Sequence, residues 1–267
     1  MQELMVASFD STQLYLKKDI PEDCRALVVL VHGLCEYQGR YDYFTERLNS
    51  ANIGVYRFDH RGHGRSEGER TFYNTFHEMV DDTDVIVELA RKEHPELPLF
   101  MVGHSMGGFC AAAYGAKYPG KVKGIVLSGG LTRDHVGLMS GKEPGQDPHV
   151  RTINDLAGDA CTVPQVSLDF AADPLNVKDF TLGLCYSVTA GIKYLEENAK
   201  CFTDPVLMLH GEEDSLVAVQ DTYDLFGMVA SKDRQMKIYG GLYHEIFNEY
   251  CRDEVIDDAA NWILNRT

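Results

Sequence analysis

The sequence predicts an α/β fold, in which a mostly parallel, doubly wound sheet carries an inserted helical cap. Short, almost continuously apolar segments that run into glycine recur along the chain, as is typical of strands buried on both faces. Helical stretches alternate with these segments, and such alternation indicates a parallel sheet covered by helices. One long stretch, residues 131–200, breaks the alternation.

The individual elements follow from these patterns. Strands are expected at 26–33, at the start of 53–64, and at 97–105, 122–130, 205–214 and 234–241. Helices are expected at 41–52, 75–93, 106–117, 219–230 and 253–265. The clearest helix is 75–93, whose apolar side chains fall mainly on one face with acidic ones on the other. Residues 5–18 predict an antiparallel hairpin with its turn at 10–12.

The stretch 131–200 contains more than one helix would need, including a helical pattern at 180–199. An insertion of this length in an α/β domain is usually functional and often forms a lid. A surface elaboration is the alternative. We therefore divide the chain into an α/β core, 1–130 and 201–267, and a cap, 131–200.

Composition excludes several classes of function. A net charge of −16 repels phosphate backbones, so nucleic acid is not an expected partner. The seven cysteines include no CxxC pair, and neither a metal nor a cofactor is expected. No run reaches the ~18 apolar residues of a membrane span. The N-terminal residues lack the basic start and apolar stretch of a signal peptide, which favours the cytoplasm.

Ser105 is the candidate nucleophile. It lies between the expected strand 97–105 and the expected helix 106–117, in the segment GHSMG (103–107). This is the G-x-S-x-G pattern of a nucleophile elbow, where a serine occupies a strained strand-to-helix turn. Gly103 and Gly107 stand where larger side chains would collide. A purely structural glycine-rich turn is the alternative.

A serine needs a base and an orienting acid to become nucleophilic, and in folds with this elbow the acid precedes the histidine in the chain. Asp214 follows the expected strand 205–214 and is the candidate acid, with Glu212 and Glu213 as competitors. His244 is the last histidine and follows the final strand, so it is the candidate base.

The developing oxyanion needs two backbone N–H donors. Met106, which follows the nucleophile, supplies one, and Leu34, in the loop after the first parallel strand, is the candidate for the other. An ordinary β-to-α turn is the alternative at Leu34.

Four stretches together resemble the monoacylglycerol lipase and lysophospholipase group of the α/β-hydrolase superfamily. They are HGLCEYQGRY (32–41), FDHRGHGRSEG (58–68), GHSMGG (103–108), and HGEEDSLV (210–217) with GLYHEIFNE (241–249). DPLN (173–176) resembles a cap segment of the same group. The resemblance spans most of the chain and is weakest over 131–170.

The resemblance implies an apolar tunnel beneath the cap for an acyl chain and a small polar pocket for glycerol. The positions that match the polar pocket are Glu36 and Arg40. Two positions depart from the group's pattern: Cys35 stands where Gly is usual, and Tyr37 where His is frequent. Both lie beside the expected oxyanion hole, and Cys35 is expected to make the site sensitive to thiol reagents.

We therefore expect a serine ester hydrolase that cleaves monoacylglycerols or lysophospholipids through Ser105, His244 and Asp214. Three alternatives remain: a short-chain or aromatic-acid carboxylesterase, a related aminopeptidase, and a non-catalytic binding protein. The apolar cap residues suit an acyl chain and helix packing equally well; they are Phe170, Leu175, Phe180, Leu182, Leu184 and Val188. The cap is also a candidate for transient membrane contact, and the sequence does not indicate an oligomeric state.

Overall fold

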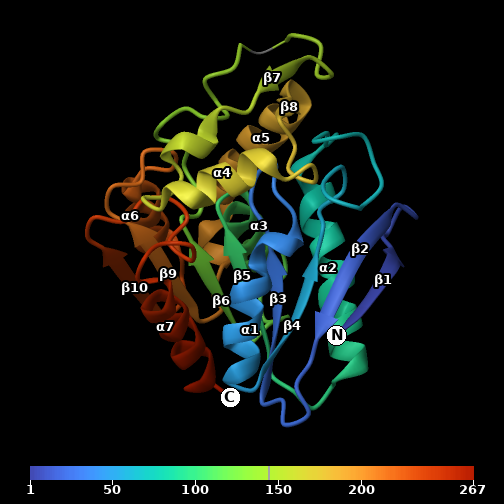
Figure 1. Cartoon of the computed structure of the whole chain (residues 1–267), viewed down its shortest axis with the longest axis vertical. Coiled ribbons are helices and arrows are strands. Elements are labelled where there is room, and N and C mark those ends of the chain that lie inside the picture. Colours follow the sequence, from blue (N-terminus) through green and yellow to red (C-terminus); the bar gives the residue numbers. More distant parts are fainter. Residues whose placement is uncertain (144) are drawn as a thin grey trace.

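The computed structural model describes residues 1–143 and 145–267 and has an eight-stranded sheet at its centre (Figure 1). The strand order is β1-β2-β4-β3-β5-β6-β9-β10. All neighbours are parallel except at β2, which is antiparallel to both β1 and β4. The strands are β1 (Gln2–Ala7), β2 (Gln13–Asp19), β3 (Ala26–Val31), β4 (Ile53–Phe58), β5 (Leu99–His104), β6 (Gly124–Ser128), β9 (Val206–Gly211) and β10 (Arg234–Tyr239).

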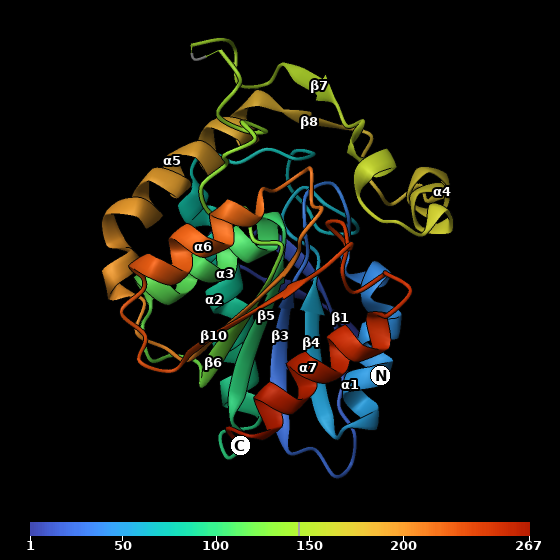
Figure 2. The same cartoon turned by 90° about the vertical axis from the view of Figure 1, so that its left-hand side faces the viewer.

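Helices cover both faces of this sheet (Figure 2). One face packs against α1 (Asp42–Ser50) and α7 (Arg252–Leu264), and the other against α2 (Phe76–Glu93), α3 (Met106–Lys117) and α6 (Val219–Met228). A further helix, α5 (Leu182–Asn198), packs on α2 and α3. The doubly wound α/β fold predicted from the alternating pattern is therefore confirmed. Its central strands β3, β4, β5 and β9 are buried throughout, as continuous apolar runs require.

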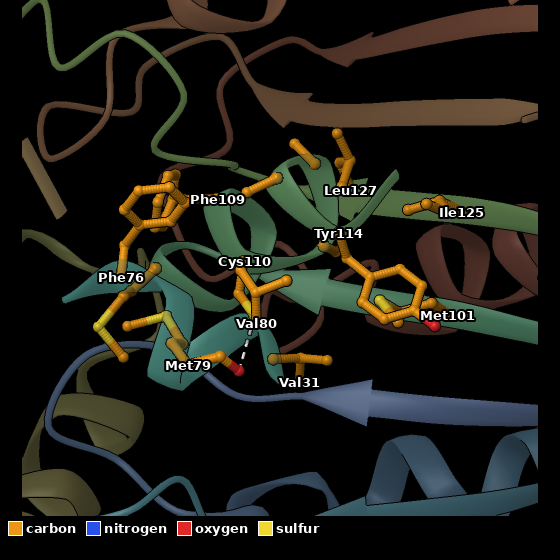
Figure 3. Packing of buried hydrophobic residues seen from close by; sticks show 14 of the residues in the cluster. Val31, Phe76, Met79, Val80, Met101, Phe109, Cys110, Tyr114, Ile125 and Leu127 are labelled. Carbon is orange, nitrogen blue, oxygen red and sulfur yellow. Dashed lines mark hydrogen bonds between the residues drawn. The ribbon is translucent and has the colours of Figure 1, made fainter. Parts of the chain in front are cut away.

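Nearly every residue of α3 is buried, which shows that this helix lies deep in the molecule. Its run of small side chains, Ala111–Ala113, lets the helix approach the sheet closely. On α2, Phe76 lies near the ring of Phe109 (Figure 3), and Asp84 accepts from the hydroxyl of Tyr114. The Sγ of Cys110 lies 3.6 Å from the carbonyl oxygen of Met79 on α2. This packing holds the first turn of α3, and hence the residue before it, in a rigid frame.

The part of the stretch 131–200 before α5 lies above the carboxyl ends of the parallel strands, whereas α5 packs against α2 and α3 (Figures 1 and 2). The stretch contains the antiparallel pair β7 (Arg151–Ile153) and β8 (Asp179–Thr181), the 3-10 helix Leu156–Asp159, and α4 (Pro164–Ala172), followed by α5. The expected helix at 180–199 is present as α5, whereas β7, β8 and α4 were not predicted. Strands of three residues are too short for an alternating pattern. Pro144, within the expected cap, lies outside the described residues.

Among the described residues, no helix is both long enough and apolar enough to span a membrane. All seven cysteines are free thiols.

Candidate active site

Ser105 occupies a strained turn between β5 and α3. Its backbone has φ 56° and ψ −119°, in the left-handed half of conformational space that side chains rarely adopt. The turn is fixed by its own backbone: the Ser105 N–H donates to the Ser128 carbonyl at 2.9 Å, and the Ser105 carbonyl accepts from Phe109 and Leu131. Strain at this position is therefore held in place by a strand on one side and a helix on the other.

The two flanking glycines are required by close backbone contacts. A Cβ at Gly103 would lie 2.3 Å from the carbonyl oxygen of Gly107. A Cβ at Gly107 would lie 2.1 Å from the carbonyl oxygen of Val31, where β3 ends. The missing side chains thus let the elbow sit directly against the loop that follows β3.

His244 and Asp214 form a buried pair. The Nδ1 of His244 lies 2.7 Å from Oδ2 of Asp214. The other oxygen, Oδ1, accepts from the backbone N–H groups of Leu216 and Val217, both at 2.9 Å. Glu212 and Glu213, which competed with Asp214 in the sequence, are exposed. Of the three carboxylates, the structure brings only Asp214 to the histidine.

His210 is a partner of Asp214 that the sequence reasoning missed. Its Nε2 lies 3.0 Å from Oδ2 of Asp214 and 2.9 Å from the carbonyl oxygen of Val217. Its Nδ1 pairs with the hydroxyl of Thr222 at 2.7 Å. The spacing of four residues between His210 and Asp214, across the end of β9, was a usable signal.

Electrostatic interactions within the pair favour a negatively charged Asp214 and a positively charged His244. Burial alone would raise the pKa of Asp214, but the charge of His244 and hydrogen bonds from His210 and His244 hold that pKa well below its usual range. Burial opposes a charged His244, yet the adjacent Asp214 carboxylate outweighs it, and the pKa of His244 is raised. The pair therefore favours an imidazolium on His244, the species formed when it accepts a proton.

The loop after β3 lies beside Ser105. A Cβ on Gly33 would be 3.2 Å from Cβ of Ser105, so the two segments approach each other closely. Leu34 follows, and Cys35 then takes φ 60°, a conformation that explains why glycine is usual at this position. Met106 is the first residue of α3. Both proposed oxyanion donors thus belong to turns that adjoin Ser105.

Three other histidines lie in this loop or pack against it. His32, His60 and His63 are fully buried, and the rings of His32 and His60 are 4.5 Å apart. Nε2 of His32 accepts from the His60 backbone N–H at 2.9 Å, while Nδ1 pairs with the Gly33 carbonyl. Burial lowers the pKa of His32 to about 4 and of His63 to about 3. These rings are neutral packing groups rather than candidates for the base.

Glu36 and Arg40 are joined by a third residue, Glu245, which the sequence reasoning missed. Arg40 donates from Nη1 to Glu36 (2.6 Å) and to Glu245 (3.0 Å), and from Nη2 to Glu245 (2.7 Å). Glu36 also accepts from the Gly33 N–H at 2.5 Å and from the Tyr41 hydroxyl at 2.6 Å. The network links the histidine loop to the loop after β3. Glu245 follows His244 directly, which was its only sequence signal.

These residues surround one cavity that reaches Ser105 and His244. Its apolar lining is Leu34, Leu131, Leu138, Met139, Leu156, Ala160, Phe170 and Leu216, and its polar lining is Glu36, Arg40, His104, Asn154 and Glu245. Of the apolar cap residues singled out in the sequence, only Phe170 belongs to the cavity. Phe180, Leu182, Leu184 and Val188 are instead buried in the core, as packing residues of α5 and the segment before it.

The cap contacts the loop after β3 directly. The Val177 N–H donates to the Cys35 carbonyl at 2.8 Å, and the Tyr37 hydroxyl donates to Oδ2 of Asp173 at 2.7 Å. The Cys35 side chain is fully buried, and burial raises the pKa of its thiol. Contrary to the expectation from the sequence, this environment makes Cys35 a poor target for thiol reagents.

The strand order, the strained serine and the buried histidine–aspartate pair are features of the α/β-hydrolase class. Residues 22–250 match the family described as serine aminopeptidase, S33, and the chain belongs to this family. It is 37% identical over 250 residues to a monoacylglycerol lipase of Mycolicibacterium smegmatis, covering 91% of this chain and 89% of that protein.

Two further comparisons agree. The chain is 29% identical over 254 residues to the monoglyceride lipase of Homo sapiens, covering 91% of this chain and 84% of that one. The crystal structure of a monoacylglycerol lipase from Paleococcus ferrophilus superposes with a TM-score of 0.84 at 30% identity, over 95% of this chain and 99% of that chain. The resemblance to the monoacylglycerol lipase group is therefore confirmed.

Proposed function

We propose that this protein is a serine carboxylic ester hydrolase that cleaves monoacylglycerols to a fatty acid and glycerol. The observation that carries the proposal is the buried His244–Asp214 pair, which shares a cavity with a serine held in a strained turn. The similarity to monoacylglycerol lipases over most of the chain supports the substrate class.

In the proposed mechanism, His244 takes the proton of Ser105 as the serine oxygen attacks the ester carbonyl carbon. Asp214 holds the imidazole by its Nδ1 and stabilises the imidazolium. The carbonyl oxygen becomes an oxyanion, which the backbone N–H groups of Leu34 and Met106 stabilise. His244 then protonates the departing glycerol oxygen, and in the second half of the reaction it activates water, which releases the fatty acid from Ser105.

The lining of the cavity supports an orientation for the substrate. The apolar side chains of Leu138, Met139 and Leu216 suit an acyl chain, because each buried methylene contributes about 0.8 kcal/mol. The polar part of the lining includes Glu36, Arg40 and Glu245, and we place the glycerol end there. Arg40 and Glu36 then contact glycerol from positions that their hydrogen bonds already fix before the substrate binds.

We prefer an ester over the N-terminal residue of a peptide because the chain is similar to monoacylglycerol lipases over most of its length. The carboxylates of the cavity do not decide this point, since Glu36 and Glu245 together exceed the single charge of Arg40. A short-chain carboxylesterase remains the second candidate, because it would use the same Ser105, His244 and Asp214.

We also propose that residues 131–200 act as a cap with its own surface role. Ile153 and Leu168 are largely exposed there, at 77% and 61%, and Val150 is exposed as well. We infer that these side chains make transient contact with lipid aggregates.

Because all seven cysteines are free, we place the protein in the reducing cytoplasm.

The decisive experiment measures glycerol release from a monoacylglycerol by wild type and by Ser105→Ala, with a short p-nitrophenyl ester as reference. We expect release by wild type at a rate comparable to the reference, and none by the variant. Cleavage of the short ester alone would move the function to a small-ester hydrolase. Release that persists in Ser105→Ala would overturn the proposed nucleophile, and a failure of wild type to react with a fluorophosphonate would indicate a binding protein.

A further inference from the structure

The polar end of the cavity has an unusual charge balance for a site that binds lipid headgroups. It contains two carboxylates, Glu36 and Glu245, and one guanidinium, Arg40. All three side chains are at most 12% exposed. The trio therefore carries a net charge of −1 in a region where water screens charges poorly, immediately beside His244.

Three of the five N–H groups of Arg40 are already engaged by carboxylates, which leaves two for an anionic ligand. Nη1 donates to both carboxylates and Nη2 donates to Glu245, at 2.6 to 3.0 Å. The ring of Phe170 covers the guanidinium at 5.0 Å. A phosphate group can reach these donors only by displacing a carboxylate, which would leave that carboxylate buried without its partner.

No second cation compensates within this lining. Arg40 is the only lysine or arginine among the described residues that line the cavity. Lys178 lies 5.1 Å from the centre of the Phe170 ring, but its ammonium is exposed and donates to the carbonyl oxygens of Phe170 and Asp173. It belongs to the outer surface of the cap.

The hydrogen-bonding groups of the site also favour an uncharged headgroup over a phosphate. Ionised carboxylates only accept hydrogen bonds, so they suit hydroxyl groups, which donate, and oppose phosphate oxygens, which also accept. Asn154, on the cap side of the lining, adds a neutral amide. The ligand that fits is an uncharged polyol.

We infer that Glu245 is a specificity-determining residue, and that this site selects acylglycerols with an uncharged headgroup over lysophospholipids with an anionic phosphate headgroup. This inference rests on the proposed function and narrows it. One uncompensated charge within several ångström of a phosphate, at protein-like dielectric, changes the relative rate by about tenfold or more.

The test compares two substrates with one acyl chain, 1-oleoylglycerol and 1-oleoylglycerol 3-phosphate, each in micelles of a neutral detergent. The measured quantity is the ratio of their kcat/KM values, in which a general loss of activity cancels. We expect wild type to prefer the uncharged substrate by about tenfold or more. Glu245→Gln, which keeps the shape and removes the charge, should reduce this preference several-fold.

Glu197→Gln is the matched control, because Glu197 is an exposed residue of α5 outside the cavity lining. It should leave the ratio unchanged. If both variants reduced the ratio equally, the overall charge of the protein would be the cause and the inference would fail.

A second measurement needs no variant and applies if Glu245→Gln does not fold. At about 1 M salt, exposed charges farther apart than about 3 Å are screened, whereas buried charges are not. The preference of wild type should persist there. Equal cleavage of both substrates, or a preference that vanishes in salt, overturns the inference. An enzyme that cleaves neither oleoyl substrate would instead count against the proposed function.

Discussion

Replacing Arg40 by Met should destabilise the fold, because it removes the only cation between two buried carboxylates. Glu36 is 4% and Glu245 9% exposed at the side chain, and both depend on Arg40 for their ion pair. Breaking a buried pair from one side typically costs about 3–5 kcal/mol. Loss of the guanidinium from the face of Phe170 adds about 0.5–1 kcal/mol. In a domain of this size the sum corresponds to a fall in Tm of roughly 10 °C.

The pH dependence gives this prediction a distinctive sign. In wild type, burial opposes ionisation of Glu36, but Arg40 outweighs it and the pKa of Glu36 is lowered. Its contribution to stability is therefore complete above its unfolded pKa and is lost as the pH falls through the folded pKa. Without Arg40, burial raises the pKa of Glu36, and the penalty is relieved as the pH falls. The stability gap between wild type and Arg40→Met should narrow from pH 7 toward pH 5.

Urea denaturation, followed by the fluorescence of Trp262, the single tryptophan, measures both effects. Arg47→Met is the matched control, since Arg47 also pairs with a carboxylate, Asp257, at 2.6 Å but at the surface. We expect little change in the control. An Arg40→Met variant no less stable than Arg47→Met, or a gap that stays constant with pH, would refute the reasoning.

Three further predictions concern the reaction centre. The pKa of His244 is raised, so kcat/KM should fall as the pH drops through that raised value and the base becomes protonated. A pH–rate profile of Asp214→Asn should show this fall at lower pH, and kcat should be reduced roughly 10⁴-fold. Gly107→Ala should abolish ester hydrolysis or folding, because its Cβ would lie 2.1 Å from a carbonyl oxygen of β3, whereas Gly227→Ala on α6, with no neighbour within 4 Å, should be tolerated in both assays. Cys35 should resist iodoacetamide in the native protein and react after denaturation, as read by mass spectrometry; rapid native labelling would contradict its burial.

The parts of the fold that could be predicted are those where one local pattern decides the outcome. The strands β3, β5 and β9 are buried on both faces, so their composition alone indicates them. The elbow at Ser105 is similar, because two glycines and a strand-to-helix transition leave few alternatives. The order of acid and histidine along the chain then points to Asp214 and His244, and the structure brings that pair together.

The parts that could not be predicted depend on contacts between distant segments. Glu245 meets Arg40 across 205 positions of sequence, and nothing local distinguishes it from other glutamates. The cap shows the same limit. Phe170 and Phe180 are both apolar residues of the same stretch, yet Phe170 faces the cavity and Phe180 the core. Which way each side chain points is decided by the packing of α4 and α5 on the rest of the molecule, and periodicity does not encode it.

The loop after β3 is held from three directions, and this has a consequence for how the cap acts on the site. Gly107 of the elbow packs on its base, Glu36 and Arg40 connect it to the histidine loop, and Val177 of the cap donates to the carbonyl of Cys35. The histidine loop is bonded to the cap as well, because the Glu245 N–H donates to the Ala160 carbonyl at 2.7 Å, whereas the bonds that position Asp214 come from β9 and the loop after it. A change in the cap therefore reaches the loop of the proposed oxyanion donor Leu34 and the loop of His244 together. It should alter stabilisation of the oxyanion and the position of the base while Asp214 stays in place.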